Sequence, residues 1–389
     1  MKIPIKKFIC ITLIFSAFLQ VTSFAENATQ VDTDVSTQLI SAKSGILMEA
    51  STGEVLYEQN ADERLQIASV TKTMTMLLIM EAIDSGKISI NDTVTVSDYA
   101  ASMGGSQVFL EPGEQMSVDD MMKAIAVASG NDAAVAMAEF VSGSEGAFVE
   151  KMNKRASELN CTNTHFINCN GLDETEEHYS TARDIALISK ELLKHEKIFD
   201  YTTIWMDSLR NGSFGLSNTN KLIRFYNGAN GLKTGSTSTA KYCISATAKR
   251  DDMQLISVVI CAPSTAERFS SASAMLDYGF ANYEVAGDDI LKTSVPYVNI
   301  IGGTESQIAP KISGNGFILK KGNLDKVEQS FELEASVNAP VTEGQKLGEV
   351  IYTIEGAEVA RRDVCADHYV PKITIMQMFV RCLSDWITL

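Results

Sequence analysis

Residues 68–80 read ASVTKTMTMLLIM and place a serine and a lysine three positions apart at the head of a long apolar run. Side chains three positions apart share one face of a helix, so a helix that starts near Ser69 would hold the Lys72 amine beside the Ser69 hydroxyl. The residues that follow are apolar on nearly every side, which indicates a helix buried inside a large domain. A serine whose proton can pass to a neighbouring amine is a candidate nucleophile.

The same pair has a purely structural interpretation, because serine is a favoured helix N-cap and a four-residue pattern also arises by chance. A second copy of the pattern spans residues 238–241. It runs into residues 242–247, a strand-like stretch in which positions three apart point to opposite faces. Helical geometry therefore selects Ser69 and Lys72 over the second copy.

Two further short motifs follow in a fixed order. Residues 129–131 read SGN between two helical patterns, so we expect Ser129 and Asn131 to project from a tight turn between helices. Residues 233–235 read KTG, after a turn-rich stretch and before a strand-like one. Another SGN at residues 313–315 lies in a strand-rich part of the chain and has glycine on both sides of Asn315, so we interpret it as a surface turn.

The ordered set S-x-x-K, S-x-N and K-T-G resembles the active-site signature of penicillin-binding proteins and serine β-lactamases. The likeness extends from about residue 39 to the C-terminus. The wider match is to low-molecular-mass penicillin-binding proteins that act as serine-type D-alanyl-D-alanine carboxypeptidases, and its stretches are residues 68–75, 129–133, 166–172, 178–184 and 231–235. One departure is Cys169, where related sequences more often carry proline.

Chemistry and resemblance together suggest roles for the motif residues. Lys72 can act as a base near neutral pH only if burial or a nearby cation lowers its pKa, and Lys233 is the candidate cation. Ser129 would pass a proton to the departing amine, while Asn131 would hydrogen-bond the substrate amide or hold Lys72. Lys233 and the Thr234 hydroxyl suit a terminal carboxylate of the substrate.

Gly235 carries no side chain, so we expect a substrate backbone to lie along its strand as an added edge. By resemblance, the oxyanion hole would use the backbone N–H groups of Ser69 and Ser236. The resemblance also implies that Arg268 lies near the carboxylate pocket; the alternative is a solvated arginine at a helix start. We further expect residues 104–106 to border the site, and His178 to help shape its rim.

The N-terminus has the pattern of an export signal. Three lysines precede the apolar residues 8–19, and small residues at Ser23 and Ala25 occupy the positions that a signal peptidase reads. We predict a signal peptide over residues 1–25 and a linker over residues 26–38, with an uncleaved anchor as the alternative. The protein would then act at the outer face of the cytoplasmic membrane or in the cell wall.

The order of the expected elements indicates an α+β fold. Strand-like alternation at 41–50 and 54–58 is followed by helical patterns and then by further strands, which predicts an antiparallel sheet with packed helices over residues 39–283. Residues 284–370 have short apolar runs broken by glycine and proline, typical of a small all-β domain. By resemblance, residues 371–389 would form an amphipathic helix on the membrane surface, although packing on the β domain is the alternative.

The predicted helices span residues 70–84, 118–128, 132–140, 147–159, 182–193 and 266–280, and the later strands span residues 240–249 and 254–261.

Composition restricts the partners. A formal net charge of −16 argues against a nucleic-acid partner, which would require clustered lysine and arginine. The four histidines are widely spaced and form no zinc motif, so we expect no metal and no other cofactor. The scattered cysteines indicate free thiols, with a disulfide between Cys161 and Cys169 as the alternative.

We therefore predict an enzyme that removes the terminal D-alanine from peptidoglycan stem pentapeptides through an acyl-enzyme on Ser69, and that β-lactams acylate. A serine β-lactamase is the first alternative, but the glutamate-containing loop of class A enzymes is missing. A non-catalytic cell-wall-binding protein is the second, and the complete set of motif residues argues against it.

Overall fold

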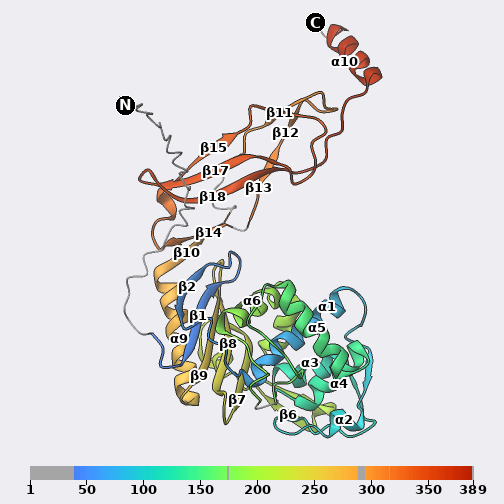
Figure 1. Ribbon diagram of the computed structural model, residues 1–389, viewed down its shortest axis with the longest axis vertical. Coiled ribbons are helices and arrows are strands. Elements are labelled where there is room, and N and C mark those ends of the chain that lie inside the picture. Colours follow the sequence, from blue (N-terminus) through green and yellow to red (C-terminus); the bar gives the residue numbers. More distant parts are fainter. Residues whose placement is uncertain (1–38, 173–174, 288–293, 315, 388–389) are drawn as a thin grey trace, which may run out of the picture. The chain divides into compact units, whose positions relative to one another are not determined.

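The computed structural model describes residues 39–172, 175–287, 294–314 and 316–387, with side chains as far as residue 381 (Figure 1). The predicted signal peptide, residues 1–25, and the predicted linker, residues 26–38, lie outside the described residues. The second SGN motif is described only at its first two residues, Ser313 and Gly314.

The first domain is built on a five-stranded antiparallel sheet with the strand order β2-β1-β9-β8-β7. The N-terminal hairpin pairs with the last strand of the domain, so the sheet joins segments about 200 residues apart. β7, which carries the KTG motif, pairs with β8 and forms one edge of this sheet in the described part of the chain. The strands are β1 Ser44–Glu49, β2 Val55–Gln59, β7 Ala229–Thr237, β8 Lys241–Arg250 and β9 Met253–Ala262.

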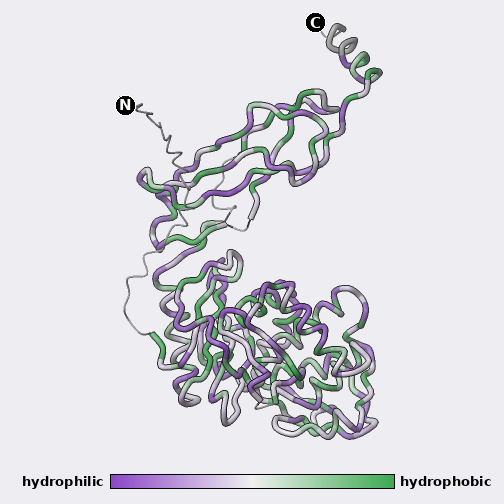
Figure 2. The backbone as a smooth tube through the Cα atoms, in the orientation of Figure 1, coloured by the Kyte–Doolittle hydropathy of each residue, from purple (hydrophilic) through white to green (hydrophobic). Residues whose placement is uncertain are grey.

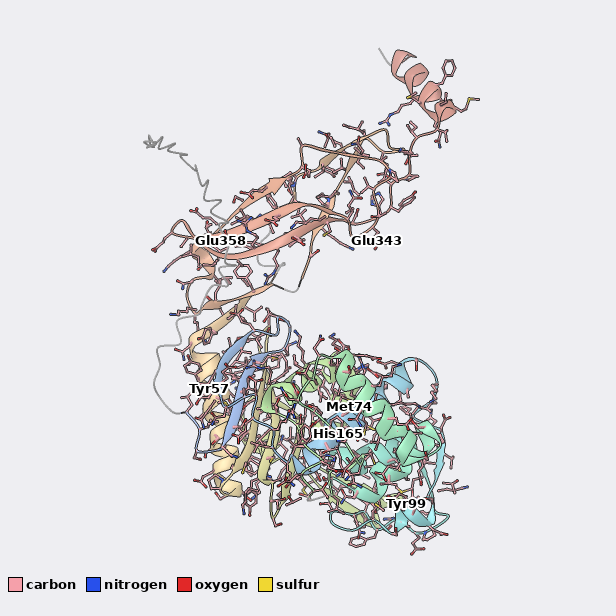
Figure 3. All side chains as sticks on the ribbon, in the orientation of Figure 1. Tyr57, Met74, Tyr99, His165, Glu343 and Glu358 are labelled. Carbon is pink, nitrogen blue, oxygen red and sulfur yellow. The ribbon has the colours of Figure 1, made fainter. Side chains whose placement is uncertain are left out.

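Helices cover both faces of the sheet, as the α+β prediction requires (Figure 1). One face carries α1 Lys72–Asp84, α3 Val118–Ala126, α4 Asn131–Ser142, α5 Glu145–Glu158 and α6 Ala182–Leu192, and the other face carries α9 Thr265–Asn282. The methionines of α1 are buried, and Met74 lies inside the helical layer (Figure 3). α1 is therefore a core helix, and its first residue is Lys72.

Shorter elements connect these layers. They are η1 Ala68–Thr71, β3 Thr93–Thr95, α2 Asp98–Ala101, β4 Gln115–Ser117, η2 Glu196–Ile198, α7 Phe199–Thr202, β5 Met206–Leu209, η3 Arg210–Gly212, β6 Phe214–Ser217 and α8 Leu222–Phe225. The copy of the S-x-x-K pattern at residues 238–241 spans the turn between β7 and β8, so its serine and lysine share no helix.

Side-chain caps fix where most long helices begin. The hydroxyls of Ser117, Ser144, Thr181 and Ser264 each accept the backbone N–H three residues further on, at the starts of α3, α5, α6 and α9. α4 has Gly130 at its N-cap and no side-chain cap. α1 also begins without a side-chain cap. The two long helices without such a cap thus begin at the S-x-x-K and SGN motifs.

The C-terminal domain is rich in β-strands, as predicted. Hydrophobic and hydrophilic stretches are interspersed throughout this domain (Figure 2). Residues 298–301 and 327–333 alternate regularly between more and less buried positions, which fits strands with one buried face. The chain then forms α10 Ile375–Ile387, so the predicted terminal helix begins four residues later than expected. No helix in the described part of the chain is long and apolar enough to cross a membrane.

The strands of this domain are β10 Tyr283–Ala286, β11 Val298–Ile301, β12 Gln307–Ile308, β13 Pro310–Ile312, β14 Phe317–Lys320, β15 Val327–Leu333, β16 Ser336–Asn338, β17 Lys346–Ile354 and β18 Ala357–Ala366, with one short helix, η4 Leu324–Lys326. The sheet with the most strands in this domain has four, in the order β13-β18-β17-β15. Figure 3 marks Glu343 and Glu358 in this domain.

Candidate active site

Ser69 and Lys72 meet at the junction of η1 and α1. Ser69 lies in the tight 3-10 turn, and Lys72 is the first residue of the helix that follows. Lys72 Nζ is 3.0 Å from Ser69 Oγ, within hydrogen-bonding reach. The three-residue spacing therefore brings the two groups together as predicted.

The Lys72 amine is completely buried and surrounded by neutral oxygens. Besides Ser69 Oγ, Nζ contacts Asn131 Oδ1 at 2.5 Å and the backbone oxygen of Asn170 at 2.8 Å. Burial lowers the pKa of Lys72 to about 7, against a smaller opposing effect from nearby acidic groups that include Asp132. Of the two causes that the sequence left open, burial and a nearby cation, burial is the dominant one.

Asn131 joins the Lys72 amine to the loop at residues 104–106. Asn131 Nδ2 donates to the Gly104 oxygen at 2.7 Å, and the Asn131 N–H donates to the Ser106 oxygen at 2.7 Å. Asn131 is the first residue of α4 rather than a member of the turn before it. The loop therefore borders the site as expected, and Asn131 holds it next to Lys72.

Ser129 lies in the turn between α3 and α4 with a left-handed backbone, φ 64°. A residue other than glycine adopts this conformation at a cost of about 1–3 kcal/mol, and such residues concentrate at functional sites. Its side chain is only 4% exposed. The strained turn puts Ser129 at the start of α4, two residues before Asn131, which contacts the Lys72 amine.

The KTG strand and α9 each bring one basic side chain to the site. Lys233 is buried, and its Nζ donates to the Thr234 backbone oxygen at 2.8 Å. Arg268, in α9, is 7% exposed, and its Nη1 donates to the Gly235 oxygen at 3.3 Å and the Cys243 oxygen at 3.4 Å. The alternative of a solvated arginine is therefore wrong.

Burial lowers the pKa of Lys233 well below its ordinary value, and the positive charges of Lys72 and Arg268 act in the same direction. Lys233 and Arg268 are two buried basic side chains without a carboxylate partner among the described residues. This part of the site therefore attracts an anion, because an anion favours their charged forms.

Gly235 is required by the protein's own backbone. A Cβ at this position would lie 2.8 Å from the Ile67 oxygen and 2.8 Å from the Ser69 nitrogen. β7 therefore packs directly against the turn that carries Ser69. Ser236 is the next residue along this strand. This packing is a reason for glycine at position 235 that is separate from the substrate backbone we expect along the strand.

With this geometry established, comparison with known proteins identifies the family. Residues 30–264 match the D-alanyl-D-alanine carboxypeptidase family, and residues 288–372 match the penicillin-binding protein 5 C-terminal domain. This chain belongs to the D-alanyl-D-alanine carboxypeptidase family. It is a serine-type carboxypeptidase and a low-molecular-mass penicillin-binding protein, so the β-lactamase and non-catalytic alternatives are not retained.

The similarity to individual relatives extends over most of the length of each relative. The chain is 47% identical over 350 residues to D-alanyl-D-alanine carboxypeptidase DacF of Bacillus subtilis, which covers 89% of this chain and 90% of the relative. Penicillin-binding protein 5 from Haemophilus influenzae has a TM-score of 0.76 at 30% identity, over 86% of this chain and 98% of that one. Penicillin-binding protein D2 of Listeria monocytogenes, in an ampicillin-bound form, has a TM-score of 0.55 at 31% identity, over 63% of this chain and 99% of that one.

In this member of the carboxypeptidase family, His178 lies behind the nucleophile turn and not at the rim of the site. It is buried, and its Nδ1 lies 3.3 Å from the Ile167 N–H, which it accepts. The neutral ring therefore carries its proton on Nε2, which donates to Thr71 Oγ1 at 2.7 Å. Thr71 in turn donates to the Ala68 oxygen at 2.8 Å, so His178 braces the turn that holds Ser69.

Sequence analysis missed two other groups at the site. The Asn170 backbone oxygen binds Lys72, and the Thr219 hydroxyl accepts a hydrogen bond from Thr234 Oγ1 at 2.7 Å. The stretch around Asn170 did resemble the family, which is a signal that could have drawn attention to it. Thr219 lies outside every motif, and no sequence signal marks it.

Cys169, where related sequences more often carry proline, forms a hydrogen bond through its backbone N–H, a group that proline lacks. Its backbone N–H donates to Glu145 Oε1 at 3.0 Å. Its thiol is free and buried, as is that of Cys161, so the alternative of a disulfide between them is not formed. Gly171, with φ 77°, then lets this loop approach η1, since a Cβ there would lie 2.0 Å from the Ala68 oxygen.

Proposed function

We propose that Ser69 removes the terminal D-alanine from peptidoglycan stem pentapeptides in two steps. Ser69 Oγ attacks the carbonyl carbon of the penultimate D-alanine as Lys72 Nζ takes its proton, and the peptide C–N bond breaks to give an ester on Ser69. Water then hydrolyses the ester and releases the shortened peptide. The 3.0 Å contact between Lys72 Nζ and Ser69 Oγ is the observation that carries this proposal.

The leaving D-alanine needs a proton and a place for its carboxylate. We assign proton delivery to Ser129, which lies in a strained turn two residues before Asn131, a contact of Lys72. Lys233, Thr234 and Arg268 would bind the terminal carboxylate, a charge-assisted contact that is about twice as strong as a neutral hydrogen bond. The burial of both cationic side chains supports this assignment, since neither has a carboxylate partner among the described residues.

Two further assignments concern the carbonyl under attack. The backbone N–H groups of Ser69 and Ser236 would form the oxyanion hole, which the contact between Gly235 and the Ser69 turn supports. Asn131 would keep the Lys72 amine in place through its 2.5 Å contact. Its remaining hydrogen-bonding capacity would be available to the substrate amide. β-Lactams would acylate Ser69 by the same attack.

The location of the enzyme is part of the proposal. We infer an exported protein, with a signal peptide over residues 1–25, a linker over 26–38, a catalytic domain over 39–283, a β domain over 284–370 and a terminal helical segment over 371–389. Ile375, Met376, Phe379 and Val380 are all exposed on α10. Exposed apolar side chains on a helix favour contact with a membrane surface.

The test is mass measurement of the intact mature protein after incubation with penicillin, together with assay of D-alanine release from a pentapeptide. We expect one adduct on the wild type, none on Ser69→Ala and much slower labelling of Lys72→Ala. Ser238→Ala and Lys241→Ala, in the second copy of the S-x-x-K pattern, are matched controls that should label normally. Labelling of the Ser69→Ala protein at the wild-type rate would refute the assignment.

A further inference from the structure

A cavity of about 580 Å³ opens beside the end of β7. Its lining includes Arg64 and Gln66, which precede the nucleophile turn, and Tyr179. It also includes Thr239 and Ala240, in the turn after β7. Gln66 comes three residues before Ser69, and Thr239 comes five residues after Thr234. The cavity therefore adjoins both the nucleophile turn and the KTG strand, and the proposed mechanism does not use it.

The cation in this cavity is held in place. Leu65 and Ser180 pair through backbone hydrogen bonds of 2.9 and 3.0 Å, which set Arg64 next to Tyr179. Arg64 donates to Asn163 Oδ1 from Nη2 at 2.8 Å and from Nε at 3.1 Å, and its guanidinium carbon lies 5.1 Å from the centre of the Tyr179 ring. These contacts leave part of the guanidinium fork for a ligand.

The same cavity contains an anion, Glu176. Among the described residues no ion pair joins Glu176 to Arg64, although both line one space and both are exposed. The neighbouring residue, Thr175, is tied to the cavity wall because its backbone oxygen accepts a hydrogen bond from Gln66 Nε2 at 2.9 Å. A cation and an anion that line one cavity, and that form no ion pair with a described residue, suit a ligand that carries both charges.

The proposed reaction determines which part of a substrate reaches this cavity. With the terminal carboxylate at Thr234 and the attacked carbonyl beside Ser236, the peptide runs antiparallel to β7, and its earlier residues lie toward Thr237. An extended chain advances about 3.3 Å per residue. The residue before the two D-alanines, the third of the stem, then lies near the turn at residues 237–240, where the cavity opens.

We propose that this cavity is a subsite for the third residue of the stem peptide, and that it prefers a side chain ending in both an ammonium and a carboxylate. This inference rests on the proposed function, because that function sets the direction of the peptide. Glu176 takes the ammonium and Arg64 takes the carboxylate. A lysine at the third position satisfies Glu176 alone, and an apolar residue satisfies neither.

Three acetylated peptides that end in D-Ala-D-Ala test the inference, with meso-diaminopimelic acid, L-lysine or L-norleucine before the two D-alanines. The mature full-length enzyme is assayed for kcat/KM on each peptide, and its rate of acylation by penicillin is measured separately. We expect the diaminopimelic acid peptide to exceed the lysine peptide by about fivefold, and the lysine peptide to exceed the norleucine peptide by about two- to fivefold.

Substitutions assign the charges. Arg64→Gln should abolish the preference for diaminopimelic acid over lysine, and Glu176→Gln should abolish that for lysine over norleucine, while both acylate with penicillin normally. Arg183→Gln is the control, since Arg183 pairs with Asp62 and Glu58 outside the cavity. If Arg64→Gln fails to fold, as judged by penicillin acylation, the Glu176→Gln variant decides whether the subsite exists, because Glu176 is exposed.

Equal kcat/KM for the three peptides on the wild type, or preferences unchanged in both variants, would overturn the subsite and leave the carboxypeptidase mechanism standing. Failure to release D-alanine from any peptide, together with failure of penicillin to label Ser69, would instead overturn the proposed function and the subsite with it.

Discussion

Gly235 and Ser69 are in direct backbone contact, and a Cβ built on Gly235 would lie 2.8 Å from the Ser69 nitrogen. This contact fixes the distance between the edge strand of the sheet and the turn that carries the nucleophile. The position of Ser69 relative to β7 is thus set by the absence of a side chain, and not by a hydrogen bond between side chains.

Gly235→Ala should therefore slow acylation sharply, because the added methyl meets backbone atoms that cannot rotate away. A displacement of about 1 Å between reacting groups can lower a rate by about a hundredfold. The measurement is the penicillin acylation rate followed by intact mass. Gly215→Ala, on β6, is the matched control, since a Cβ there meets nothing within 4 Å. Equal rates for the two variants would contradict this account.

The depressed pKa of Lys72 predicts how acylation depends on pH. Burial lowers this pKa to about 7, so the amine changes from ammonium to neutral base as the pH rises through that value. Acylation by penicillin should rise between about pH 6 and pH 8 and then level off. A rate that is flat across this range, or that falls, would show that Lys72 is not the base.

The same shift has a consequence for stability, with a definite sign. Between pH 7 and the unfolded-state value near 10.5, the unfolded chain binds more protons at Lys72 than the folded one, so the free energy of unfolding increases with pH in this window. Lys72→Met removes that proton difference. Denaturant titrations at several pH values should give a smaller increase with pH for the variant than for the wild type, and an equal increase would contradict the buried, neutral state.

Local patterns were enough to predict much of this architecture. The apolar run after Lys72 predicts α1, and the spacing of Ser69 and Lys72 predicts their contact, because both depend on the period of one helix. The hairpin at residues 44–59 was also predictable from alternation around a turn. Its pairing with β9, about 200 residues away, follows from packing against α6 and α9, which no local pattern contains.

The parts of the site that the sequence did not reveal depend on contacts between distant segments. Lys72 is buried against Asn131 and the loop at Asn170, which are distant in sequence, so the sequence left open whether burial or the charge of Lys233 lowers its pKa. His178 was assigned to the rim because its sequence neighbours resemble the family, whereas its side chain is buried against Thr71. A side chain's direction within a loop is decided by tertiary packing.

The hydrogen-bonded pair His178 and Thr71 predicts a positioning effect on the nucleophile. His178→Ala leaves Thr71 Oγ1 without its buried donor, which costs about 1–3 kcal/mol. We expect slower penicillin acylation and a lower free energy of unfolding, and we expect Thr71→Val to add little once His178 is gone. A double-mutant cycle on both quantities measures this coupling.

His195→Ala is the control for this cycle, since His195 pairs with Asp84 away from the nucleophile turn. Fully additive effects of His178→Ala and Thr71→Val on acylation would mean that the two residues do not act through one contact.

Arg268 provides the last test, because it separates binding of the carboxylate from the chemistry at Ser69. Arg268→Gln removes one buried cation whose hydrogen bonds reach the backbone oxygens of Gly235 and Cys243. Loss of a charge-assisted contact worth about 2 kcal/mol should lower kcat/KM by about thirtyfold for a peptide with a free terminal carboxylate. A peptide with an amidated C-terminus should be a poor substrate for both proteins and should show little difference between them.

Arg250→Gln, which alters an arginine packed on Tyr226 and Phe280, should leave both rates unchanged. An equal loss on the free and the amidated peptide would show that Arg268 supports the fold of the site and does not bind the carboxylate.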